Sequence, residues 1–117
     1  MGVPITKILD NSVVTTNATV TKIFSFDAST DGVYLINCNV CAFNETDGKA
    51  YCQELYRGFK RVSATVSALA ASVNTFNFGD ATITVTITNT GDELYVEVTG
   101  VAAKTIDWNI TTVIKYT

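Results

Sequence analysis

Between residues 81 and 88 the sequence alternates without a break between aliphatic residues and threonine. A period of two sends every aliphatic side chain to one side of the backbone and every threonine to the other, which is the geometry of a β-strand and not of a helix. The aliphatic side then faces a core, and the threonine side faces away from it. The chain must therefore build a sheet that is covered on one side.

Other segments repeat this pattern, and turn residues separate them. Residues 33–43 place apolar side chains at alternate positions, and Asp31-Gly32 and residues 44–48 mark the turns on either side. Strand patterns also occupy residues 18–26, 50–63, 94–99 and 106–116. Residues 64–71 are rich in alanine, and their periodicity does not decide between a helical turn and a weak strand. We predict an all-β fold, an antiparallel β-sandwich that is jelly-roll-like, with seven or eight strands.

A chain of 117 residues has the size of one domain. Residues 1–11 show an apolar group before any clear alternation, so we expect a short N-terminal arm there and the β-sandwich domain at residues 12–117. The arm either folds back on its own domain or covers the sheet edge of a neighbouring chain. Its candidate assembly contacts are Val3, Pro4, Ile5, Ile8 and Leu9.

The strand at residues 50–63 is mixed on both faces. One face alternates three apolar residues with Gln53, Arg57 and Arg61, and the other also combines apolar and charged side chains. Such a strand either lies between its own core and another subunit, or lets long basic side chains lie along the sheet. We take Tyr51, Arg57 and Arg61 as further candidate assembly contacts.

Charged residues make up only 16% of the chain, and the net charge is -3. Without a basic patch, nucleic acid is not an expected partner. No apolar run approaches the length that spans a membrane, and no signal peptide is visible, so we expect a protein made in a cytoplasm and no membrane partner. A surface with few charges is also easy to bury in an oligomer.

The sequence contains no histidine, and its acidic residues gather in predicted turns, where aspartate is favoured for backbone reasons. We therefore expect no enzyme activity, no catalytic residues, no metal and no cofactor.

Three cysteines complete the inventory of reactive side chains. Cys38 and Cys41 have the CxxC spacing of zinc sites, but an odd offset in a strand sends them to opposite faces, and further ligands are lacking. We expect all three thiols, including Cys52, to stay reduced and mostly buried. Cys38 with Cys52 is the only disulfide that we consider.

The second half of the chain carries a series of motifs, namely Phe59-Lys60-Arg61, the threonine-alternating strand, Val96-Glu97-Val98-Thr99-Gly100 and Thr105-Ile106-Asp107-Trp108. With these motifs, residues 20–117 resemble small β-domains of tailed-bacteriophage virion proteins. In such proteins a strand that ends in Val-Thr-Gly, a short linker and a strand with Thr-Ile/Val-Asn/Asp-Trp recur near the C-terminus of tail-fibre heads and capsid-surface proteins.

The resemblance implies a structural protein of the virion that is made in the host bacterial cytoplasm. A start at Met1 with only a short arm, and no long shaft, favours a capsid decoration (cement) protein, which by the resemblance would be a homotrimer on the major capsid protein. The alternative is a tail-fibre head that binds a host surface receptor, either a glycan or a protein, through exposed aromatic residues.

Overall fold

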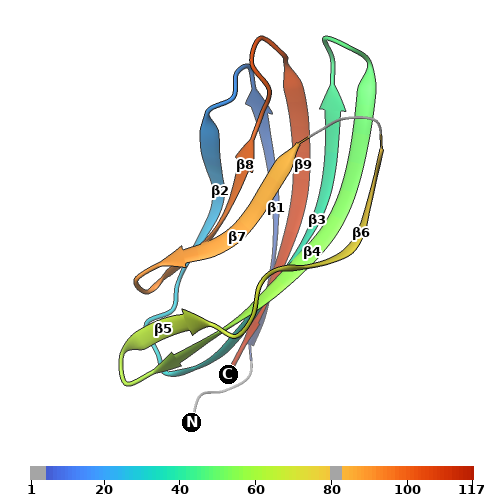
Figure 1. The fold of residues 1–117 in the computed structure, drawn as a ribbon. Coiled ribbons are helices and arrows are strands. Elements are labelled where there is room, and N and C mark those ends of the chain that lie inside the picture. Colours follow the sequence, from blue (N-terminus) through green and yellow to red (C-terminus); the bar gives the residue numbers. More distant parts are fainter. Residues whose placement is uncertain (1–4, 80–82) are drawn as a thin grey trace.

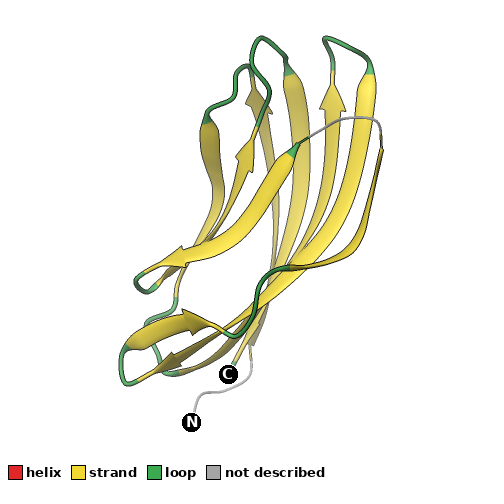
Figure 2. Ribbon diagram, viewed as in Figure 1, coloured by secondary structure: helices red, strands yellow, loops and turns green. Residues whose placement is uncertain are grey.

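A computed structural model of the chain describes residues 5–79 and 83–117. These residues form strands and loops and contain no helix (Figures 1 and 2). Accordingly, the described part of the chain offers no long apolar helix that could cross a membrane. The strands are β1 (Ile5–Thr15), β2 (Val20–Asp27), β3 (Gly32–Asn44), β4 (Lys49–Val62), β5 (Thr65–Ala68), β6 (Val73–Gly79), β7 (Thr84–Thr90), β8 (Glu93–Thr99) and β9 (Ile106–Tyr116).

The strands pack as two antiparallel sheets, so the predicted β-sandwich is confirmed. The larger sheet has the order β1-β9-β3-β4-β5, with β6 also paired to β4, and the smaller sheet has the order β2-β8-β7. Figure 1 shows the three-stranded sheet lying across one side of the longer strands. We call the side of the six-stranded sheet that faces the smaller sheet its inner face, and the opposite side its outer face.

The core lies between the two sheets. Alternate residues of β3 and β9 point inward, as their sequence pattern predicts, and meet the apolar side of β8. The largest fully buried side chains are Trp108, Tyr34, Phe59, Ile36, Leu55, Ile87, Leu94, Ile106, Ile110, Ile114, Val96 and Val98. Burying this much aliphatic and aromatic surface is the main force that holds the two sheets together.

The structure corrects the expected arm. From Ile5 onward the chain is part of β1, which pairs with β9 over its whole length from Ile5 opposite Tyr116 to Thr15 opposite Ile106. The backbone of this segment thus folds onto its own domain, because an antiparallel strand satisfies its hydrogen-bonding groups at the edge of the sheet. Val3 and Pro4 lie outside the described residues.

The alanine-rich segment left open above forms β5, which pairs with the end of β4. The two residues that connect them, Ser63 and Ala64, both have positive φ values of 50° and 63°. Two such residues make a type I′ hairpin, for which Asn-Gly is the usual sequence. The Asp31 carboxylate accepts hydrogen bonds from both backbone N–H groups at 3.0 and 3.3 Å, which helps to hold this turn without a glycine. Together with β1 and β6, this hairpin raises the strand number in the described residues to nine.

The Val-Thr-Gly and Trp elements of the sequence motif meet at one residue of β1. Trp108 donates its indole N–H to the hydroxyl of Thr15 at 2.9 Å, in a buried position. Gly100 lies against the same threonine, since a Cβ added there would come within 2.5 Å of Thr15 Oγ1 and of the Asn17 carbonyl oxygen. These two elements of the motif thus fix the end of the sandwich.

Candidate assembly surface

The outer face of the six-stranded sheet carries many large apolar side chains that the described residues leave uncovered. The pairing register places them on the outward positions of four strands, β1, β3, β4 and β6. Ile8 is 68% exposed and Leu35 is 40% exposed. The others that are at least partly open to solvent are Val14, Val33, Phe43, Tyr56, Val62, Val73 and Phe76.

Strand β3 supplies the centre of this surface. Its inward positions are buried, yet its outward positions include Val33, Leu35 and Phe43, so the strand is apolar at several positions on both faces. Strands of this kind are typical of sheets that are covered on both sides. The sequence of β3 thus shows the pattern of a strand with apolar residues on both faces, while the outer face is open in the described structure.

Charged side chains on the outer face leave one row across the sheet uncharged. Lys60 and Lys115 lie near one end, opposite Val33 and Leu35 of β3. Asp107 lies near the other end, and Asp10 and Glu54 lie in the row next to the uncharged one. The row between them consists of Ile8, Val113, Asn37, Tyr56 and Val73, which are all uncharged. An uncharged centre with charges around it is the usual composition of a protein interface.

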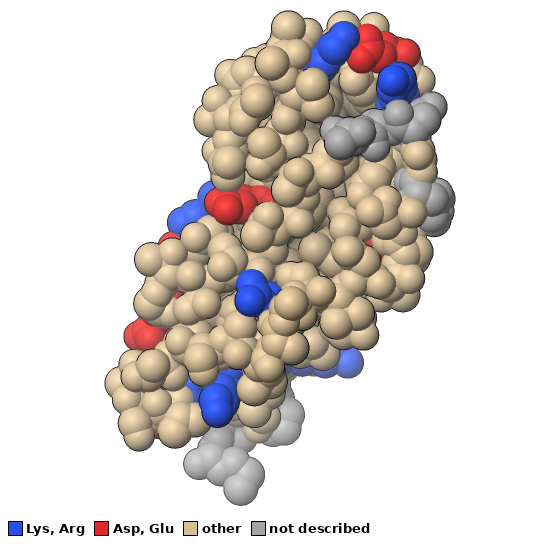
Figure 3. All heavy atoms as spheres, viewed as in Figure 1, with Lys and Arg blue, Asp and Glu red and all other residues tan. Residues whose placement is uncertain are grey.

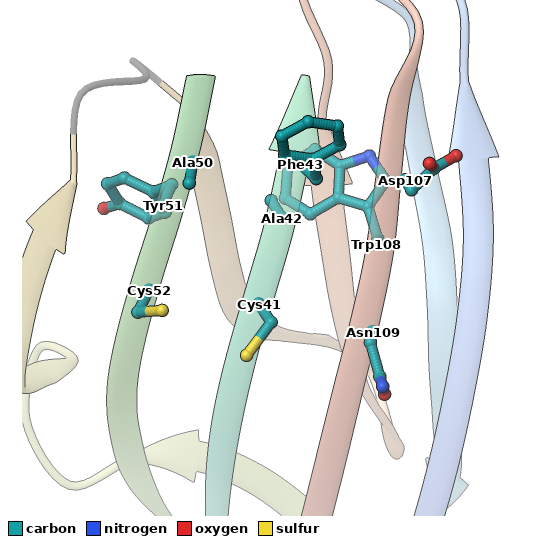
Figure 4. A pocket seen from close by; sticks show the side chains of 9 residues that line it. All are labelled: Cys41, Ala42, Phe43, Ala50, Tyr51, Cys52, Asp107, Trp108 and Asn109. Atoms are coloured by element: carbon teal, nitrogen blue, oxygen red, sulfur yellow. The ribbon is translucent and has the colours of Figure 1, made fainter. Parts of the chain in front are cut away.

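A shallow hollow of about 350 Å³ opens at the Asp107 end of this face. Figure 4 shows its lining on the neighbouring strands β4, β3 and β9, with Phe43 at one end of it and Cys41 and Cys52 below. Beside it, the carboxyl groups of Glu45 and Asp107 share a hydrogen bond, which raises the pKa of Glu45. The hollow has an apolar lining, and the described residues contain no group of three or more metal-binding side chains.

The candidate contacts near the N-terminus lie on both sides of β1. Ile8 projects outward, between Thr6 and Asp10. Ile5 and Leu9 occupy the inward positions, opposite Tyr116 and Thr112, but remain 39% exposed because the smaller sheet leaves this end of the edge strand open. These residues stay available for contact with another chain, although they belong to a strand and not to an arm.

The candidate contacts in β4 point inward instead. Tyr51 is buried, and its hydroxyl lies 3.3 Å from Oε1 of Gln53. Arg57 donates to the carbonyl oxygens of Ala70 and Ile87, both at 2.9 Å, and so connects the two sheets. The mixed character of this strand thus reflects contacts within the chain.

Arg61 likewise finds its partners within the chain. Its guanidinium lies 2.9 Å from the carboxylate of Asp31 and 3.5 Å from that of Asp92. Like Arg57, it lies along the sheet, as the second of the two alternatives describes.

The cysteines divide between the two faces in a way that excludes the pairing considered above. Cys38 is fully buried on the inner face, where burial raises its pKa to about 11. Cys52 is on the outer face, so Cys38 and Cys52 lie on opposite sides of the sheet and cannot bond. All three thiols are free, and Cys41 is exposed, contrary to the expectation of mostly buried thiols.

The side of the molecule formed by β5, β6 and β7 is also poor in charge. Figure 3 shows only scattered basic and acidic side chains on it. The described residues form few ion pairs, such as the exposed pair of Lys22 and Glu93 at 2.8 Å, which joins β2 to β8. Nothing on this side concentrates charge for an ionic partner.

No protein-family model and no curated protein sequence matches the chain. One solved structure does match in three dimensions, the tailspike protein of Acinetobacter baumannii phage AM24, with a TM-score of 0.57 and 9% sequence identity. The chain is thus similar in fold to a portion of a phage tailspike protein. The match covers 97% of this chain but only 26% of the tailspike chain, so the similarity concerns one portion of that protein. At 9% identity it shows the fold alone.

Proposed function

We propose that this chain is a structural protein of a tailed-phage virion, which binds its neighbours through the outer face of the six-stranded sheet and performs no chemical step. The observation that carries the proposal is the uncovered apolar face, with its uncharged central row. The likeness to part of a phage tailspike supports the virion as its location. The chain spans about a quarter of that protein, so the tailspike's own activity is not carried over.

The size of the outer face fits an assembly role. Its long strands have 11 to 14 residues. At ~3.3 Å per residue and ~4.8 Å between strands, a sheet of this kind presents a surface of roughly 800 Å². A standard protein interface also buries about 800 Å² on each partner. The face is therefore large enough to hold a specific neighbour without the help of a deep pocket.

Within the virion, we propose a capsid decoration protein that forms a homotrimer on the major capsid protein. The long edge strand β1 favours assembly, because an unpaired edge promotes aggregation unless a neighbour covers it. A closed ring of three subunits, joined through the outer face and this edge, would cover both by symmetry. Weak contacts repeated around a capsid would then reinforce the shell through multivalency.

A second placement, in the tail, is favoured by the tailspike likeness. In this case the chain would be a head domain that binds a receptor on the host surface, either a glycan or a protein. The exposed aromatic residues Tyr56 and Phe43 of the outer face would be its contacts.

Binding to purified particles separates the two placements. The protein should sediment with expanded capsid shells that lack it, and should not sediment with host cell envelopes. The variant Leu35→Lys places a charge in the apolar face and should stay in the supernatant, whereas Val20→Lys makes the same change on the other sheet, at a valine that is 51% exposed, and should bind normally. A protein that ignores shells and binds envelopes would establish the receptor-binding placement. Equal binding of both variants to shells would show that the outer face is not used.

A further inference from the structure

Cys41 and Cys52 are direct partners across two neighbouring strands. The register of the β3–β4 hairpin places them opposite each other, and both side chains point to the outer face. Figure 4 shows the two sulfur atoms turned toward each other from neighbouring strands. Neither residue is buried, whereas Cys38 lies on the opposite face with its sulfur 3.7 Å from the hydroxyl oxygen of Thr112.

The backbone geometry of this pair is compatible with a disulfide. Directly opposite residues of antiparallel strands have Cα atoms roughly 4.5 or 5.5 Å apart, and disulfides span about 4.4 to 6.8 Å between Cα atoms. The Cβ atoms of such a pair are roughly 4.5 to 5.5 Å apart, slightly more than a relaxed disulfide prefers. The strands must approach a little for the bond to close, which makes the bond possible but readily reduced.

The two thiols already interact in the reduced state. Desolvation raises the pKa of Cys41, and the neighbouring Cys52 raises it further through its charge and a hydrogen bond between the side chains. Both effects favour the protonated form of Cys41 at neutral pH. The thiolate that starts an exchange reaction is therefore formed more readily in mildly alkaline solution.

We propose that Cys41 and Cys52 form a reversible cross-strand disulfide by exchange with a small-molecule disulfide such as oxidised glutathione. The thiolate of Cys41, the more exposed of the two, attacks one sulfur of glutathione disulfide and releases one glutathione. The thiolate of Cys52 then attacks the Cys41 sulfur of the mixed disulfide and releases the second glutathione. The protein loses two protons and two electrons, and one glutathione disulfide becomes two glutathione thiols.

This bond would join β3 and β4 at the end of the outer face that holds the apolar hollow, since both cysteines line that hollow. A reducing cytoplasm would keep it open, and an oxidising medium outside the cell would close it. The inference concerns the free chain and does not depend on the proposed function.

The test is to incubate the folded protein with oxidised glutathione at mildly alkaline pH, block free thiols with N-ethylmaleimide after unfolding, and measure the intact mass. The wild type should lose about 2 Da, two hydrogen atoms, and take up one maleimide, at Cys38. Trypsin should then yield a linked pair of peptides, residues 23–49 and residues 50–57, because Lys49 separates the two cysteines. Addition of dithiothreitol should restore three reactive thiols.

Matched variants assign the bond. Cys38→Ser should still form it and take up no maleimide, whereas Cys41→Ser and Cys52→Ser should not lose the two hydrogens. Three reactive thiols in the oxidised wild type would overturn the proposal. Loss of the bond in Cys38→Ser would also overturn it, as would a disulfide-linked dimer in place of the internal bond.

Discussion

The two faces of the six-stranded sheet are built from the same strands but differ in how far their apolar side chains are buried. In β3, Ile36 is fully buried on the inner face, while its neighbour Leu35 is 40% exposed on the outer face. The inner face also provides partners for its polar groups, as Trp108 with Thr15 and Arg57 with two carbonyl oxygens show. The inner face is therefore explained by the fold, whereas contacts among the described residues do not explain the apolar outer face.

The comparison predicts its largest effect in the core. Ile36→Ala should lower the free energy of unfolding by about 2 to 5 kcal/mol, because it leaves a cavity between the sheets. Leu35→Ala should cost less than about 1 kcal/mol, since the leucine is already partly in water. Denaturant unfolding of both variants, under conditions where the protein is monomeric, measures the difference. Equal costs would show that the outer face contributes as much to folding as the core does.

A second pair compares cations on the two faces of β4. Arg57→Met should cost roughly 2 kcal/mol, because it removes charge-assisted hydrogen bonds to the carbonyl oxygens of Ala70 and Ile87. Lys60→Met, on the outer face, should change the unfolding free energy by less than about 0.5 kcal/mol. Thermal unfolding of both variants measures the two costs. If Lys60→Met were the more damaging change, Arg57 would not be the connection between the sheets.

Threonines give a third and smaller contrast. Thr15→Val should cost about 1 to 2 kcal/mol, because the buried indole N–H of Trp108 loses its acceptor. Thr111→Val removes a hydroxyl that donates to Asp10 at 2.7 Å on the exposed face, and should cost less than about 0.5 kcal/mol. Urea unfolding, followed by Trp108 fluorescence, resolves the two values. If Thr15→Val were as stable as the wild type, the Thr15 hydroxyl would not contribute to the stability of the core.

The smallest effect concerns the exposed ion pair on the three-stranded sheet. The hydrogen bonds from Lys22 and Ser25 lower the pKa of Glu93, so the folded state binds its proton less readily than the unfolded state does. The stabilisation is present above the ordinary pKa of a glutamate and is lost as the pH falls through the lowered value. Glu93→Gln should therefore reduce stability slightly at pH 7 and leave it unchanged at pH 3, as thermal unfolding at the two pH values would show. If Glu93→Gln instead lost stability at pH 3 and none at pH 7, the ion pair would not stabilise the fold.

Much of the fold follows from the sequence because alternation determines which side of a strand is buried. The inward residues of β3 and β9 are confirmed as predicted, and the Trp108 side chain is in the core. Strand β1 was missed because Ile5, Ile8 and Leu9 do not alternate, and their strand conformation comes from pairing with β9. The partners of Arg57 lie in segments far along the chain, so local patterns do not reveal them.

The site residues show a similar division. The Cys41–Cys52 contact follows from the short loop between Asn44 and Lys49, since these two residues set the register of the hairpin. The outer face had a visible signal in the apolar residues Val33, Leu35 and Phe43, which occupy the face of β3 opposite its core residues. What the sequence does not contain is the identity of the neighbour that covers them.

Light scattering of the purified protein at low micromolar concentration tests the central claim most directly. The wild type and Val20→Lys should both have a mass near three chains, and Leu35→Lys should have the mass of one chain while it unfolds at nearly the same temperature as the wild type. This result would show that the outer face is dispensable for folding and necessary for assembly. A monomeric wild type, or a Leu35→Lys protein that assembles like the wild type, would contradict the account.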